Sequence, residues 1–177
     1  MFTVAALYRF ATFADPQATA ADLRALCADL GTCGTLILAR EGINGTVAGT
    51  AEAIERLVAH IRALPGCADV DVKYATADSA PFGKMKVKVK AEIVTLGAGD
   101  LDPAHQAGVH LDPTDWNALI ADPDTVIIDT RNAYEVAVGT FPGAIDPGTA
   151  GFSDFPAWFR EHRDELAGKR VAMFCTC

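Results

Sequence analysis

The first 75 residues alternate between the hydrophobic period of a strand and that of a helix, and this alternation constrains the fold more than any other feature. Apolar runs predict strands at 2–10, 34–39 and 46–48, and an alternation of polar and apolar residues predicts a half-exposed strand at 69–75. Two amphipathic helices separate them: one ends at Gly31, and the other begins after Thr50 and ends at Pro65. The predicted order of elements is therefore β-α-β-β-α-β.

This order predicts an α+β first unit with the split βαβ arrangement of ferredoxin-like and acylphosphatase-like domains. A further strand is predicted at 84–95. Its period of two places four lysines on one side, opposite apolar residues: Lys84, Lys86, Lys88 and Lys90, here called the lysine row. Ammonium groups at this spacing suit the phosphates of a polyanion. The same spacing also fits a face that only meets solvent, or an edge strand that lysines protect from aggregation. The binding role and these structural roles all stay open.

The second half of the chain predicts an α/β unit. A Gly- and Asp-rich stretch at 100–109 predicts the linker to it. The predicted elements are a helix opened by Asp112 and Pro113, a strand at 125–129, a helix over 155–166 and a strand at 171–174. Ligands of α/β sheets bind beyond the carboxyl ends of the strands. Asp129 and Cys175 lie at two such ends.

Composition narrows the class of protein. The net charge of −8 comes from 100–177, because 1–99 holds ten basic and ten acidic side chains. An acidic total argues against a general nucleic-acid binder but allows a local basic patch.

No apolar stretch approaches the roughly 20 residues that cross a bilayer, and no signal peptide is recognisable, so we expect a cytoplasmic protein without membrane contact. The five cysteines show no zinc-type spacing and are expected to be reduced, and the sequence identifies no metal site and no cofactor.

Two groups of residues at strand ends carry candidate chemistry. Cys175 follows an apolar run, as a nucleophilic cysteine would, although a buried structural cysteine gives the same pattern. Asp129 and Arg131, with Glu135, form either a buried ion pair that fixes a turn or a site that orients a substrate anion.

Two predicted turns complete the candidates. The turn at 40–45 carries Arg40 and Asn44, which can hold a phosphate or a base edge, or it is a plain hairpin turn with solvated ends. The segment 139–145 is predicted to turn into a short edge strand and to have no chemistry of its own.

These residues together resemble the bacterial rhodanese-domain tRNA uridine hydroxylases. The matching segments are 40–45 (Arg-Glu-Gly-Ile-Asn-Gly), 84–88 with 92–94, 129–135, 138–141 and 174–176, in the family's order. The resemblance implies an acylphosphatase-like domain over 1–99, a linker over 100–109 and a rhodanese-like domain over 110–177. It also implies hydroxylation of the wobble uridine of tRNA at C5 to 5-hydroxyuridine, with molecular oxygen as co-substrate and the anticodon region as the bound part of the tRNA.

The resemblance also implies roles for the candidate residues. Cys175 would be catalytic, and Asp129, Arg131 and Glu135 would support the active site. The substrate-binding residues would be Arg40, Asn44, Lys84, Lys86, Lys88 and Lys90. The family continues from this cysteine as Cys-Thr-Gly-Gly-Ile-Arg-Cys, whereas the present sequence stops at Cys177. We therefore expect an incomplete rhodanese-like domain and an inactive chain. The alternatives are a rhodanese-type sulfurtransferase with a Cys175 persulfide and a non-catalytic remnant.

Overall fold

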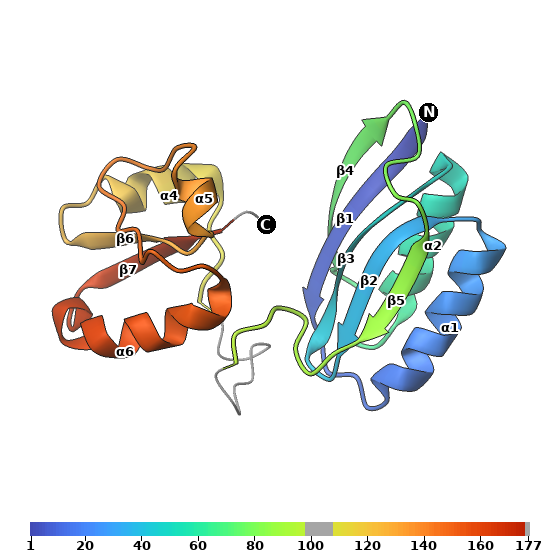
Figure 1. Cartoon of the computed structure of the whole chain (residues 1–177), viewed down its shortest axis with the longest axis horizontal. Helices are drawn as coiled ribbons and strands as arrows, with labels where there is room; N and C mark the ends of the chain where they lie inside the picture. Colours follow the sequence, from blue (N-terminus) through green and yellow to red (C-terminus); the bar gives the residue numbers. More distant parts are fainter. Residues whose placement is uncertain (98–107, 176–177) are drawn as a thin grey trace. The chain divides into compact units, whose positions relative to one another are not determined.

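The computed structural model describes residues 1–97 and 108–175, which form two compact units (Figure 1). The first unit holds Met1–Val94, and the second includes 108–175. The predicted linker at 100–109 lies outside the described residues, apart from 108 and 109, which have no regular secondary structure. Within the two described ranges, no helix is both long and apolar enough to cross a membrane.

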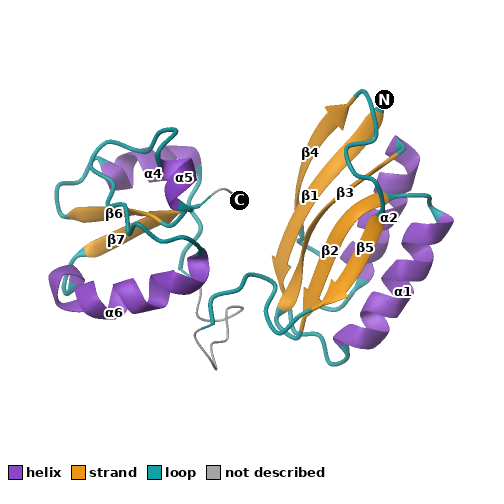
Figure 2. Ribbon diagram, viewed as in Figure 1, coloured by secondary structure: helices purple, strands orange, loops and turns teal. Residues whose placement is uncertain are grey.

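Within residues 1–97, the first unit is a five-stranded sheet with two helices on one face (Figure 2). Its elements are β1 (Phe2–Phe10), α1 (Pro16–Asp29), β2 (Cys33–Ala39), β3 (Gly42–Gly49), α2 (Ala51–Ala63), β4 (Asp71–Ala77) and β5 (Met85–Val89). The strand order is β4-β1-β3-β2-β5, and only β5 pairs in parallel, with β2. The predicted α+β arrangement is therefore confirmed, with β5 added at one edge.

Local sequence explains how the helices form and which face they cover. Asp15 accepts hydrogen bonds from the first turn of α1, and Thr50 caps α2 by accepting from the Ala53 N–H at 3.1 Å. Both helices bury apolar side chains against the sheet in one core, which includes Leu23, Cys27, Ile54, Leu57, Ile61, Leu7, Leu36, Ile43, Val47 and Val87. The opposite face of the sheet carries neither α1 nor α2, and we call it the open face.

Three strand boundaries differ from the predictions. β3 begins at Gly42 and not at 46, so the predicted turn at 40–45 shrinks to its first two residues. Glycines that suggested a turn in fact allow close strand pairing: a Cβ on Gly45 would lie 2.1 Å from the Thr35 carbonyl oxygen, and Gly42 has φ +153°. β5 ends at Val89 and not at 95, and β4 spans Asp71–Ala77 and not 69–75.

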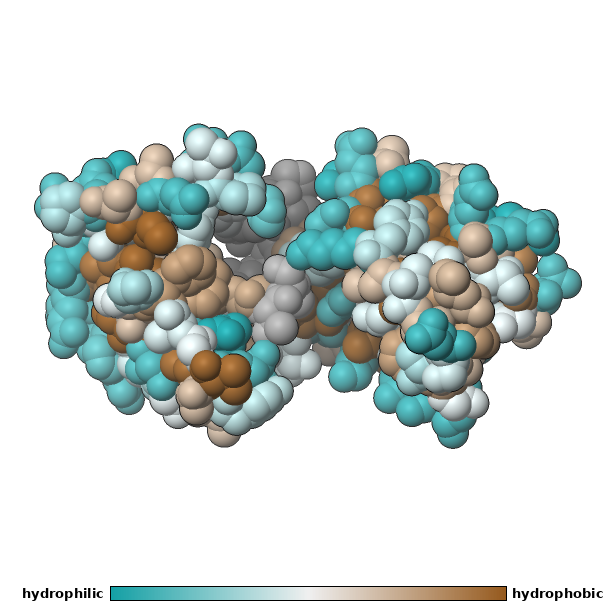
Figure 3. Space-filling model, turned by 90° about the horizontal axis from the view of Figure 1, so that it is seen from above, coloured by the Kyte–Doolittle hydropathy of each residue, from teal (hydrophilic) through white to brown (hydrophobic). Residues whose placement is uncertain are grey.

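The second unit pairs two parallel strands with short helices. Its elements are α4 (Pro113–Ile120), β6 (Thr125–Asp129), α5 (Ala133–Val136), the 3-10 turn Phe152–Asp154, α6 (Phe155–Leu166) and β7 (Arg170–Phe174). β6 and β7 form the sheet, to which Ile145 adds one parallel bridge at Ile128. The apolar cluster buried among the described residues of this unit is small and centres on Ile128, Phe155 and Leu166. Figure 3 shows apolar residues on the surface of the unit, at the left. The predicted α/β class is confirmed, whereas the rhodanese-like assignment stays a prediction.

Candidate functional site

A buried network surrounds Asp129 at the carboxyl end of β6. One carboxylate oxygen accepts from the Arg131 backbone N–H at 3.1 Å and from Nε at 2.9 Å. The other accepts from Arg131 Nη2 at 2.6 Å and from Thr140 Oγ1 at 2.7 Å. Arg131 Nη2 also donates to the Gly139 carbonyl at 2.6 Å. The predicted ion pair is thus present, and the segment 139–145, predicted to lack chemistry, supplies two of its partners.

These contacts favour a supporting role for the pair. The hydrogen bonds from Arg131 hold the pKa of the Asp129 carboxyl below its ordinary value, so the group is ionised at neutral pH. The same pairing raises the pKa of the Arg131 guanidinium. Glu135 Oε2 accepts from the Asn132 backbone N–H at 3.1 Å and caps the short helix α5. All three predicted support residues therefore shape the turn that follows β6.

Cys175 lies beside this network, at the end of β7. β6 and β7 are parallel, with Asp129 paired to Phe174. Thr130 binds the Phe174 carbonyl through its backbone N–H at 3.0 Å and its hydroxyl at 2.8 Å. The Cys175 side chain is exposed. The two strand ends that the sequence singled out therefore lie at one edge of the sheet, with an exposed thiol near the ion pair of the buried Asp129 and the partly exposed Arg131.

The buried cysteines differ from Cys175. Burial raises the pKa of the Cys27 and Cys67 thiols, which lie in the core of the first unit and are unsuited to nucleophilic attack at neutral pH. Cys33 is half-buried in β2. Among residues 1–97 and 108–175, no three His, Cys, Asp or Glu side chains lie close enough to hold a metal ion.

The lysine row lies at one edge of the first sheet. β5 is an edge strand, and all four lysines are exposed, whereas its apolar residues face the core, as predicted. Arg24 of α1 reaches the same edge and donates from Nε and Nη2 to the Val87 carbonyl at 3.3 and 3.1 Å. Together with Lys86 and Lys88, it lines a shallow hollow. Sequence reasoning missed Arg24, because it lies 63 positions from its acceptor.

Arg40 and Asn44 have different surroundings. Arg40 is exposed in the β2–β3 turn, and its side chain makes no hydrogen bond or ion pair with the described residues. Asn44 lies within β3 and donates from Nδ2 to the Ile93 carbonyl at 3.1 Å. The Ile93 N–H in turn donates to Glu41 Oε1 at 2.8 Å. Asn44 therefore has a structural partner, whereas Arg40 is available to a ligand.

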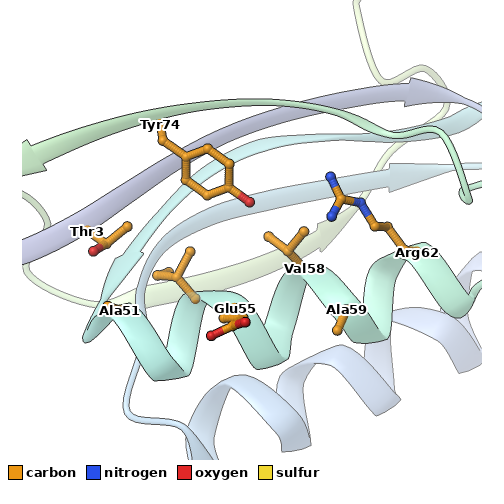
Figure 4. Close-up of a pocket in the computed structure, with 8 residues that line it drawn as sticks. Thr3, Ala51, Glu55, Val58, Ala59, Arg62 and Tyr74 are labelled. Atoms are coloured by element: carbon orange, nitrogen blue, oxygen red, sulfur yellow. The ribbon is translucent and has the colours of Figure 1, made fainter.

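A hollow on the helix side of the sheet contains none of the predicted site residues. Figure 4 shows Tyr74 of β4 above α2, from which Val58 and Arg62 extend toward the sheet. The hollow is also lined by Thr3, Ala51, Ile54, Glu55 and Ala59. The candidate site residues thus all lie outside this hollow.

Comparisons with known proteins identify the family. The UPF0176 acylphosphatase-like domain matches residues 2–93. A tRNA uridine(34) hydroxylase of Caulobacter vibrioides is 61% identical over 182 residues, which cover 99% of this chain and 58% of that protein. A protein of the same name from Mesorhizobium japonicum is 57% identical over 173 residues, covering 98% of this chain and 56% of its own length. The chain therefore spans somewhat more than half the length of these relatives.

The assignment to a family rests on sequence. An acylphosphatase from Coxiella burnetii resembles the structure with a TM-score of 0.36 and 10% identity, over 49% of this chain and 90% of that one, which is too weak a likeness to carry an argument. The domain match covers more than half of the chain, and the relatives match nearly all of it. The predicted family is confirmed: the chain belongs to the UPF0176 family, and the curated relatives that it matches are named tRNA uridine(34) hydroxylases.

Proposed function

We propose that this chain takes part in the oxygen-dependent hydroxylation of the wobble uridine of tRNA at C5, giving 5-hydroxyuridine. The observation that carries the proposal is the 61% identity, over 99% of the chain, to a protein named for uridine 34 of tRNA. The rhodanese-like nature of 110–177, the domain boundaries at 99 and 110, and a cytoplasmic location belong to the same proposal.

The lysine row binds the tRNA backbone in this proposal. All four lysines are exposed along the β5 edge, and Arg24 of α1 is exposed beside it, so phosphates can reach these cations. Each phosphate contact releases counterions from the nucleic acid, so the affinity falls as the salt concentration rises. Arg40 supplies a further cation, close to the anticodon region of the bound tRNA.

Cys175 is the catalytic residue in this proposal, and Asp129 with Arg131 positions the loop beside it. The thiol is exposed at the end of β7, next to a buried carboxylate that already has donors on both oxygens. The exposed thiol is also what a sulfurtransferase needs, so a rhodanese-type persulfide at Cys175 is the second candidate. Release of thiocyanate from thiosulfate and cyanide distinguishes it from hydroxylation.

Binding is tested with tRNA and this chain at several salt concentrations. The double variant Lys86→Gln/Lys88→Gln should lower the slope of log K against log salt by about 2. The control Arg56→Gln/Arg62→Gln removes the same charge from α2 and should leave the slope unchanged. If both double variants change the slope equally, the lysine row makes no specific contact with the tRNA and only faces solvent.

Activity is tested in a bacterium that lacks its own wobble hydroxylase. Residues 1–175 replace the matching part of the Caulobacter vibrioides relative, and wobble nucleosides are measured by mass spectrometry. The chimera should restore the hydroxylated nucleoside, and Cys175→Ser should abolish it. A chimera that transfers sulfur to cyanide but makes no hydroxylated nucleoside would favour the second candidate. The expectation that the chain alone is inactive stays a prediction, and the same assay tests it.

A further inference from the structure

The open face of the first sheet has an aromatic residue on β1, next to the β4 edge, and a lysine at the opposite edge, on β5. Strand pairing places Tyr8 of β1 opposite Asn44 of β3, Asn44 opposite Ile37 of β2, and Ile37 opposite Lys88 of β5. Residues paired in this way point to the same face of a sheet. All four are at least partly exposed, so they form a continuous row across the open face.

A neighbouring row carries small and polar side chains between two lysines. Thr46 of β3 is opposite both Ala6 of β1 and Thr35 of β2. Ala6 is opposite Lys73 at the β4 edge, and Thr35 is opposite Lys86 at the β5 edge. The open face therefore has small and polar side chains between Lys73 at the β4 edge and Lys86 at the β5 edge, and Asp71, opposite Tyr8, adds one acid at the β4 edge.

Ile93 covers one end of the open face, and a second aromatic ring lies beside Tyr8. Ile93 is 3% exposed and lies over Gly42, which pairs with Phe10. The Phe10 ring meets the Tyr8 ring edge-on, with centroids 5.1 Å apart. This contact restrains the Tyr8 ring before any ligand arrives, which lowers the entropy lost on binding.

We propose that the open face binds an unstacked, single-stranded segment of RNA, with a base stacked on Tyr8 and phosphates held by Lys86 and Lys88. The inference rests on the proposed function and specifies which part of the tRNA this unit contacts: a loop and not a helical stem. Unpaired bases offer their faces to aromatic side chains while their phosphates meet cations. An A-form stem hides its base faces, so it would meet only the lysines.

The spacing of the strands agrees with an extended segment. Tyr8 and Lys88 lie three strand spacings apart, about 14 Å at roughly 4.8 Å per strand. A base on Tyr8 and a phosphate at Lys88 therefore belong to different nucleotides of one segment that crosses the sheet. Thr46 and Thr35 lie between these points and offer hydroxyl groups to the bases or the sugars.

The test compares two tyrosine variants of this chain. Binding of a labelled single-stranded oligouridylate and of an RNA duplex of equal length is measured by fluorescence anisotropy. Tyr8→Ala should weaken single-strand binding by roughly 5- to 150-fold, leave its salt slope unchanged and barely affect the duplex. Tyr74→Ala is the control, because Tyr74 is 57% exposed but faces the helix side (Figure 4). It should bind like the wild type.

A second measurement needs no variant. An oligonucleotide that carries 5-iodouridine is photo-crosslinked to the unaltered chain, and the crosslinked peptide should contain Tyr8. Crosslinks only elsewhere, or equal losses for Tyr8→Ala and Tyr74→Ala, would overturn the inference. So would a Tyr8→Ala variant that keeps its RNA affinity but loses self-association, since the face would then bind a second copy. A different result would contradict the proposed function alone: RNA binding would still depend on Tyr8, but the chimera would make no hydroxylated uridine.

Discussion

Replacing Asp129 by alanine should destabilise the second unit and leave the stability of the first unit unchanged. The change leaves the Arg131 guanidinium, whose side chain is 19% exposed, without its carboxylate, and it removes the acceptor of the Thr140 hydroxyl. Breaking a buried pair by removing one partner costs about 3–5 kcal/mol of unfolding free energy. We expect about 3 kcal/mol, because Arg131 keeps some solvent and the Gly139 carbonyl. For a unit of this size, that loss lowers the melting temperature by about 12–24 °C.

The two tryptophans make the assay selective. Both of them, Trp116 and Trp158, lie in the second unit. The Trp116 ring lies 5.6 and 5.9 Å from the rings of Phe141 and Phe174, beside the network. Tryptophan fluorescence should therefore follow the second unit, while far-ultraviolet circular dichroism also follows the sheet of the first. In Asp129→Ala, the fluorescence transition should move to lower temperature without the main dichroism transition.

Asp164 offers a control for the loss of a carboxylate. Asp164 is exposed on α6, and Asp164→Ala should change the free energy of unfolding by no more than about 0.5 kcal/mol. If Asp129→Ala melts like Asp164→Ala, the network does not stabilise the unit. A stable, folded Asp129→Ala chimera without hydroxylation would assign the carboxylate a direct catalytic role and refute the scaffold argument.

Acid should destabilise the second unit through Asp129, because the pKa of this carboxyl is lowered in the folded state. Its contribution to the free energy of unfolding is complete above the ordinary carboxyl pKa of about 3.9. The contribution is lost as the pH falls through the lower pKa of the folded state. The wild type should therefore lose its stability advantage over Asp129→Ala only in this acidic range, as acid titration of the fluorescence would show. Gly45→Ala should destabilise the first unit by about 3 kcal/mol in urea unfolding, whereas Gly83→Ala, with open space around it, should have little effect. Arg40→Ala should keep the melting temperature of the chain and lower hydroxylation by the chimera; a large fall in melting temperature with normal product would make Arg40 structural.

Hydrophobic periodicity was sufficient to predict most of the fold, because burial repeats with the period of each element. Leu23 and Cys27 are spaced as one helix face, and both are fully buried. The start of β3 could not be predicted in this way. Glycine signals a turn and a close backbone approach alike, and only the pairing with β2 shows that the second applies at Gly45.

The candidate site was predictable where it follows single strands. Asp129 and Cys175 end apolar runs, and parallel pairing brings those ends together. Thr140 was missed because it lies in a loop, and a loop has no hydrophobic periodicity from which its contact with Asp129 could be predicted. Tyr8 was missed because apolar residues occupy both faces of β1, so their pattern does not reveal which side chains face the helices.

The contacts of Ile93 determine where the first unit can be separated from the rest of the protein. Its N–H and carbonyl are bound by Glu41 and Asn44, and its side chain is buried over Gly42. A fragment that ends at the last residue of β5 would lack Ile93, so the apolar surface that Ile93 covers would be exposed. A fragment that ends after Val94 keeps Ile93, so limited proteolysis should release an autonomous piece with its new terminus beyond Val94.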